Sequence, residues 1–157
     1  MSRTGEAGSA TSLDQETSLV NPLVLDTNIA LDLFVFEDPA TEPLRAALAG
    51  GQWIATAAMR EELVRVLDYP QIARRLNAQA RPAQDVLDAF DRCTRLVAEA
   101  PKAAYTCKDP DDQKFIDLAA AHRATLVSKD DAVLCMAKRL ARVGVQVCRE
   151  WSSTHVD

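Results

Sequence analysis

The sequence predicts an α/β domain built on a parallel sheet. Short apolar runs alternate with longer segments whose apolar residues recur at helical spacing, a pattern typical of βα units. The chain has 157 residues, 48% of them hydrophobic and 26% charged, which suits one domain with a sizeable core. Three prolines suit early helix positions and three glycines suit helix ends: Pro43, Pro70, Pro82, Gly50, Gly51 and Gly144.

Each apolar run is expected to form one strand of the sheet. The strands are predicted at residues 22–26, 53–55, 95–98, 124–128 and 145–148. Helices are predicted at residues 28–36, 41–49, 58–68, 71–77, 82–94, 111–122 and 131–142. The segment from Glu99 to Pro110 contains two prolines and is predicted to be a loop that leads into the helix at 111–122.

The two ends of the chain are expected to lie outside the domain. Residues 1–18 are rich in Ser, Thr, Gly and Glu and contain no apolar segment, which predicts a disordered tail rather than a signal peptide. We therefore expect tails at 1–20 and 151–157, around a domain at 21–150. No run approaches the roughly 18 apolar residues of a membrane-spanning helix.

The cysteines and the net charge narrow the class of protein further. Four cysteines without C-x-x-C spacing favour reduced thiols in the cytoplasm over disulfides or a zinc site. The net charge of −5 argues mildly against nucleic-acid binding, but less so if bound metal neutralises several acids. Basic residues also gather locally, for example at Arg74 and Arg75. Composition alone does not decide the substrate.

Four acidic residues lie where βα units would bring them together. Asp26 follows the first apolar run, Asp130 closes the run at 125–128, Glu62 lies in the helix after the second run, and Asp112 opens the helix at 111–122. Polar residues at the carboxyl ends of parallel strands share one edge of the sheet. Because four carboxylates cannot share a small volume without cations, the sequence predicts a divalent-metal site.

Helical spacing predicts which member of each adjacent acidic pair faces this site. Glu62 stands three residues after Met59 and therefore flanks the apolar stripe of its helix, whereas Glu61 points to solvent. Asp112 is aligned with Phe115 and the rest of the apolar face of the next helix.

The neighbours of Asp112 and Asp130 are expected to point elsewhere. Asp111 and Asp117 leave the apolar face of their helix, and Asp131 faces away from the stripe that Asp130 adjoins. A simpler reading of Asp112 stays open: Asp109 caps the helix, and acids in its first turn are favoured by the helix dipole. Oxygen-only ligands select hard cations, so we expect Mg²⁺ or Mn²⁺, which activate water for phosphodiester hydrolysis.

The acidic motifs resemble those of PIN-domain nucleases. The matching segments are Leu25-Asp26-Thr27-Asn28, Arg60-Glu61-Glu62-Leu63, Asp109-Pro110-Asp111-Asp112-Gln113-Lys114-Phe115 and Leu126-Val127-Ser128-Lys129-Asp130, within a match from about Leu23 to Cys148. The resemblance implies a three-layer α/β/α fold with sheet order 3-2-1-4-5 and Mg²⁺- or Mn²⁺-dependent cleavage of RNA. It makes Asp26, Glu62, Asp112 and Asp130 the metal-binding and catalytic acids, with Thr27 and Asn28 as accessory polar groups.

The similarity is greatest to toxin components of bacterial toxin–antitoxin systems. This implies a cognate antitoxin as protein partner and a homodimer, with no role for a membrane. The apolar residues Leu31, Leu33, Phe34 and Phe36, with Leu44 and Leu48, exceed what one buried stripe needs, so they are expected to form the partner surface unless they are plain core.

Other classes fit less well. A haloacid-dehalogenase-type phosphatase needs a second Asp where this chain has Asn28, and a phosphate-receiver domain needs an acceptor Asp after the third strand, where Glu99 stands. A PIN module that binds RNA or protein without turnover is the alternative function.

Overall fold

The computed structural model describes residues 21–151. Within them, five parallel strands form one sheet: β2 (Leu23–Leu25), β3 (Trp53–Ala55), β4 (Thr94–Leu96), β5 (Thr125–Val127) and β6 (Gln146–Cys148). Their order is β4-β3-β2-β5-β6, which is 3-2-1-4-5 in chain order and confirms the predicted fold class. The tail expected at 1–20, and nearly all of the tail expected at 151–157, lie outside the described residues.

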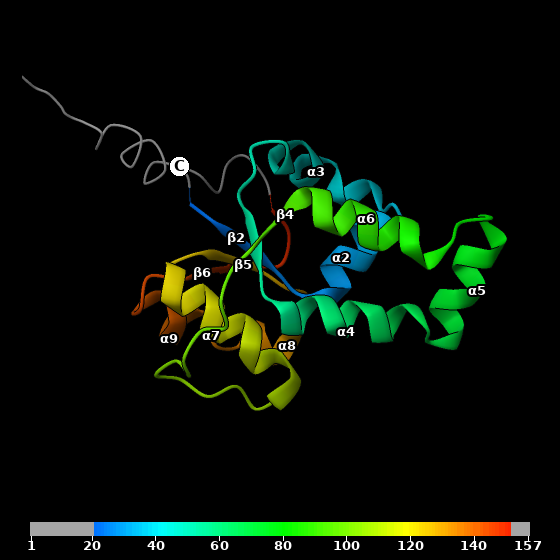
Figure 1. Cartoon of the computed structure of the whole chain (residues 1–157). Helices are drawn as coiled ribbons and strands as arrows, with labels where there is room; N and C mark the ends of the chain where they lie inside the picture. Colours follow the sequence, from blue (N-terminus) through cyan, green and yellow to red (C-terminus); the bar gives the residue numbers. More distant parts are fainter. Residues whose placement is uncertain (1–20, 152–157) are drawn as a thin grey trace, which may run out of the picture.

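Helices connect successive strands and cover the sheet. They are α2 (Thr27–Phe34), α3 (Glu42–Leu48), α4 (Ala57–Leu67), α5 (Pro70–Ala78), α6 (Ala83–Cys93), α7 (Gln113–His122), α8 (Asp131–Leu134) and α9 (Ala137–Ala141). Two 3₁₀ turns, η1 (Pro39–Thr41) and η2 (Pro110–Asp112), precede α3 and α7. Figure 1 shows α2, α3 and α6 on one side of the strands and α7 and α9 on the other. No helix in this described range is long and apolar enough to cross a membrane.

Two predicted helices differ from the structure. The helix expected at 111–122 begins as the 3₁₀ turn η2, because Asp109 caps that turn and Pro110 occupies its first position. The helix expected at 131–142 is broken at Cys135 and Met136, so that α8 and α9 both pack against β6. No proline or glycine marks this break, which follows from the packing of both pieces on the sheet.

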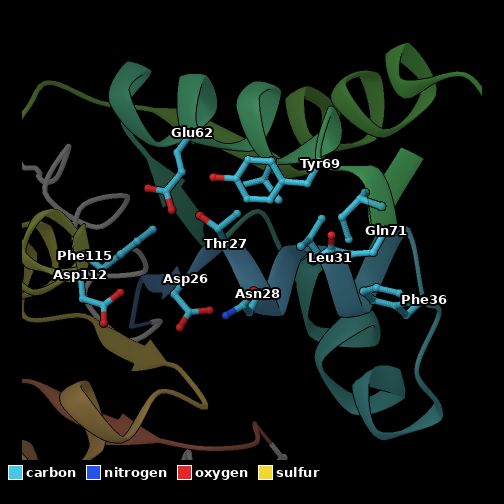
Figure 2. Close-up of a pocket in the computed structure, with 12 residues that line it drawn as sticks. Asp26, Thr27, Asn28, Leu31, Phe36, Glu62, Tyr69, Gln71, Asp112 and Phe115 are labelled. Carbon is cyan, nitrogen blue, oxygen red and sulfur yellow. The ribbon is translucent and has the colours of Figure 1, made fainter. Parts of the chain in front are cut away.

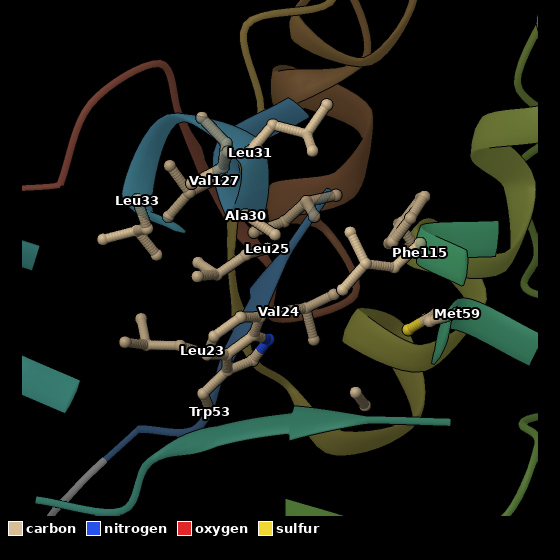
Figure 3. Packing of buried hydrophobic residues seen from close by; sticks show 14 of the residues in the cluster. Leu23, Val24, Leu25, Ala30, Leu31, Leu33, Trp53, Met59, Phe115 and Val127 are labelled. Carbon is tan, nitrogen blue, oxygen red and sulfur yellow. The ribbon is translucent and has the colours of Figure 1, made fainter. Parts of the chain in front are cut away.

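Five of the six early apolar residues belong to the core. Leu33 is fully buried and Phe34 is 8% exposed, and Leu31, Leu44 and Leu48 are buried as well. Helix α2 packs against α4 and α6, so it is covered on more than one side. The Phe34 ring stacks on Trp53 of β3, with ring centroids 5.9 Å apart. Figure 3 shows Leu31, Leu33 and Trp53 around the side chains of β2. The alternative of a core role therefore holds for five of the six residues, whereas Phe36 is 36% exposed, and the protein partner itself stays a prediction.

The central strands bring two loop residues to one point. Leu25 at the end of β2 is in register with Val127 at the end of β5. The amide of Asp26 donates a hydrogen bond of 3.2 Å to the Val127 carbonyl, which fixes Asp26 against β5. Asp26 and Ser128 thus leave the sheet side by side, at the edge where parallel α/β folds place their functional groups.

Candidate active site

Asp26 is a buried carboxylate with a full set of local partners. Its side chain is the N-cap of α2, where Oδ1 accepts a hydrogen bond of 3.1 Å from the amide of Ile29. Oδ2 accepts a hydrogen bond from the hydroxyl of Ser128, a residue with no exposed surface. Burial raises the pKa of Asp26, although the hydrogen bonds from Ser128 and Ile29 oppose this effect.

Three carboxyl groups approach closely beside Asp26. One oxygen atom from each of Asp109, Asp112 and Asp130 lies within 4.8 Å of the others. Asp109 caps η2 and Asp130 caps α8, where Oδ1 of Asp130 accepts a hydrogen bond of 2.9 Å from the amide of Ala132. The amide of Asp130 also donates a 3.1 Å hydrogen bond to the Ser128 hydroxyl oxygen, so Ser128 connects Asp130 to Asp26. The group could hold a divalent cation through oxygen ligands.

Asp112 lies at the centre of the site and lacks a partner for one oxygen. The residue is 9% exposed, and its Oδ2 is buried without a hydrogen bond when the carboxyl is ionised. Burial, together with the hydrogen bond to Asp130 and the charges of Asp130, Asp109 and Asp26, raises the pKa of Asp112 to about 8. The hydrogen bond from the protonated Asp112 lowers the pKa of Asp130. The pair therefore shares a proton where a cation would otherwise balance the charge.

Glu62 reaches the site from α4, which is anchored at several points. The Thr56 hydroxyl caps the helix by accepting from the Met59 amide, and Arg60 forms a two-pronged ion pair with Asp91 of α6, with hydrogen bonds of 2.8 and 3.0 Å. That guanidinium lowers the pKa of Asp91. These contacts fix the direction in which Glu62 projects from its helix.

Lys114 supplies a positive charge beside Glu62. Its ammonium group forms an ion pair with Glu62 Oε1, a buried oxygen that has no hydrogen-bond partner within the described residues. The same ammonium donates a hydrogen bond of 2.7 Å to the carbonyl of Asp111 and lies 5.0 Å from the centre of the Phe115 ring. Lys114 therefore balances one of the clustered negative charges in the metal-free protein.

The acids open into a cavity of about 420 Å³. Asp26, Glu62 and Asp112 line one end of it, and Figure 2 shows their carboxylates pointing into the same space. Thr27 and Asn28, the expected accessory residues, also line the cavity. Asp130 is not among the lining residues and meets the site through Asp112 and Ser128. Asp112 therefore belongs both to the cavity and to the close cluster with Asp109 and Asp130.

The helical faces agree with the sequence prediction. Glu61, Asp111 and Asp131 are exposed, while Glu62 and Asp112 face the cavity. Asp117 does leave the apolar face, but it is half-buried, because it accepts hydrogen bonds from the amide of Ala103 and the side chain of Gln113. The catalytic roles of the four acids stay a prediction.

Sequence reasoning missed four contributors to the site. Ser128 follows β5 at the same sheet edge as Asp26, and that position was the signal that could have identified it. Asp109 was assigned only to helix capping, and Lys114 had no sign that it would meet Glu62. Gln113 bonds to the backbone of Tyr105 and Cys107, and so holds the loop before Asp112 in place.

The fold and the site together define an α/β domain with an acidic centre at the carboxyl edge of its sheet. The sequence matches the model of the PIN domain family over residues 22–132, well over half of the chain and a range that includes all four acids. The chain therefore belongs to the PIN domain family, whose members are typically metal-dependent nucleases. No match was found among curated proteins.

Proposed function

We propose that the chain is a Mg²⁺- or Mn²⁺-dependent endoribonuclease that hydrolyses phosphodiester bonds in RNA. The observation that carries this proposal is the buried Asp112 carboxylate, which has an unpartnered oxygen and two further carboxyl groups within 4.8 Å of one of its own oxygens. Such a group needs either a proton or a cation, and its oxygen-rich surroundings suit a hard cation. The residues present thus fit a divalent metal ion.

The roles of the side chains follow from their positions. Asp112, with Asp130 and Asp26, would hold the metal, and Glu62 would complete the site from the opposite wall of the cavity. A bound Mg²⁺ or Mn²⁺ would polarise the phosphodiester and make a water molecule a better nucleophile. Ser128 keeps the Asp26 carboxylate in one orientation.

The accessory residues would contact the substrate rather than the metal. Thr27 and Asn28 line the cavity next to Asp26, where a hydroxyl and an amide can bind a phosphate oxygen or position a water molecule. RNA rather than another phosphodiester is proposed because the four acidic motifs resemble those of PIN nucleases.

We further propose that the chain acts as the toxin of a type II toxin–antitoxin pair. The support is the motif resemblance and the open acidic cavity, in which an Arg or Lys of an antitoxin would meet several carboxylates. A homodimer is proposed on the resemblance alone, because all but Phe36 of the apolar residues first expected at its interface are core. Co-purification with a small protein encoded next to this chain would test the antitoxin partner.

The nuclease is tested by incubating single-stranded RNA with the purified chain in Mg²⁺ or Mn²⁺, with EDTA as control. We expect cleavage only with metal, and a melting temperature that rises with metal concentration because the ion binds the folded state. RNA binding without cleavage would favour the alternative, a PIN module without turnover. The absence of both cleavage and a thermal shift at millimolar metal would contradict the metal site itself.

A further inference from the structure

The cavity that holds the acids has a second end with different chemistry. Besides Asp26, Glu62 and Asp112, its walls include the aromatic rings of Tyr69 and Phe36. Tyr69 is 50% exposed and Phe36 is 36% exposed, and they are the two aromatic side chains among the large hydrophobic residues exposed within residues 21–151. Isolated exposed apolar residues need no explanation, but two aromatic rings in one cavity beside an acidic site do.

The backbone of Tyr69 is held at the junction of two helices. Tyr69 is the N-cap residue of α5, and Pro70 follows it directly. The Tyr69 amide donates a hydrogen bond of 3.0 Å to the Val66 carbonyl of α4. In Figure 2 the ring lies across from Thr27, with its hydroxyl end directed toward Glu62. A planar aromatic surface therefore stands next to the acidic end, on a backbone that is fixed at the helix junction.

One positive charge lies beside the aromatic end. The guanidinium of Arg75 lies 5.4 Å from the centre of the Phe36 ring, and the neighbouring Arg74 is exposed on the same helix. Gln71 also lines the cavity and offers an amide that can both donate and accept hydrogen bonds. One end of the cavity thus suits a metal-bound phosphate, and the other combines aromatic and amide groups, with the Arg75 guanidinium beside Phe36.

We propose that Tyr69 stacks an unpaired nucleobase of the RNA next to the phosphodiester held at the acidic end, in the cavity that Phe36 also lines. Every base has a π-face that stacks on aromatic rings, and arginine adds attraction for the strand. Bases within a duplex are already stacked on one another and cannot take this place. This inference rests on the proposed nuclease function.

The test measures RNA binding rather than cleavage. A fluorescent short single-stranded RNA is titrated with the full chain in Ca²⁺ in place of Mg²⁺, and its integrity is checked afterwards. Replacing Tyr69 by Ala should weaken binding about 5- to 150-fold, as expected for the loss of one stacked base. Tyr69→Phe should bind nearly as well as the wild type. Leu96→Ala, an exposed apolar change on the edge strand β4, is the matched control and should have no effect.

A set of RNAs that each lack one base identifies the stacked position. At one position the missing base should weaken binding to the wild type but not to Tyr69→Ala, because the ring has no base left to contact. Equal RNA binding by the wild type and Tyr69→Ala would overturn the proposed stacking on Tyr69 and leave the nuclease proposal standing. Preference of the wild type for duplex over single-stranded RNA would also overturn it. A wild-type chain that neither binds nor cuts RNA would remove both proposals.

Discussion

The buried acidic surroundings that suit Asp112 to metal binding also make its ionised carboxylate unfavourable without metal. Its carboxyl is buried among Asp26, Asp109 and Asp130, and these charges hold its pKa near 8 in the metal-free protein. A carboxyl that keeps its proton at neutral pH must lose it before binding a cation, so metal binding should release protons and strengthen as the pH rises. The site therefore exchanges a proton for a metal ion.

The raised pKa of Asp112 predicts how the stability of the chain depends on pH without metal. Between the ordinary pKa of 3.8 and about 8, the folded chain holds a proton on Asp112 that the unfolded chain has lost. Stability should therefore fall as the pH rises through this range. The raised pKa of Asp26 acts in the same direction, whereas the lowered pKa of Asp130 matters only in acid.

Melting temperatures measured in EDTA from pH 5 to pH 9 check this dependence. The wild type should lose stability toward pH 9, and Asp112→Asn, which has no proton to lose, should lose clearly less. By pH 8 the variant should be the more stable of the two by more than about 1 kcal/mol. Parallel pH curves for the two proteins would show that Asp112 has an ordinary pKa.

At the scale of residues, the sequence was sufficient to predict which side chains face the site where helical periodicity decides their orientation. The choice of Glu62 over Glu61 needed only the spacing to Met59, and both residues lie as this spacing requires. The contact of Lys114 with Glu62 depends on the packing of separate elements, so no local pattern could predict it, whereas the position of Ser128 at a strand end was a usable signal.

Among the elements, short helices begin at the site and are capped by its acids. Asp26 caps α2, Asp130 caps α8, and Asp109 caps the turn η2. Each of these carboxylates therefore has a structural role in addition to its proposed role in metal binding. Alanine substitutions would confuse the two roles, and asparagine substitutions separate them.

The capping role can be measured at Asp130. Asparagine keeps a side-chain oxygen for the amide of Ala132, whereas alanine removes it. Asp130→Ala should be less stable than Asp130→Asn by about 1 kcal/mol, while both lose a metal ligand. Thermal melts in EDTA report the first difference, and a Mn²⁺ titration reports the second. Identical melts would mean that α8 does not depend on its cap.

The elements themselves were predictable to within one or two residues at most ends. Each strand follows an apolar run, and the helices begin near prolines and polar caps. The break between α8 and α9 escaped prediction because the periodicity of 131–142 continues through it. Such a break depends on packing against β6, which is tertiary information.

For the whole molecule, the sheet order explains how distant residues meet. Because β2 lies between β3 and β5, the chain segments that carry Asp26, Glu62 and Ser128 leave neighbouring strands at one edge. The resemblance of the motifs implied this order, and periodicity alone did not. Periodicity also did not show that Leu33 and Phe34 are buried while Phe36 is partly exposed, since a helix covered on several sides and a helix with an exposed apolar face have similar sequences.

The most direct test of the account compares Asp112→Asn with Asp111→Asn in metal-dependent RNA cleavage. The two residues are adjacent at the start of α7, so their effects on the helix dipole should agree within roughly 1 kcal/mol. Only Asp112 is buried in the cavity, and Asp111 is exposed. Asp112→Asn should remain folded but lose most cleavage, because an amide is a poor ligand for a hard cation, while Asp111→Asn should cleave nearly as the wild type does. Equal loss in both variants, or no loss in either, would contradict the assignment of Asp112 to the metal site.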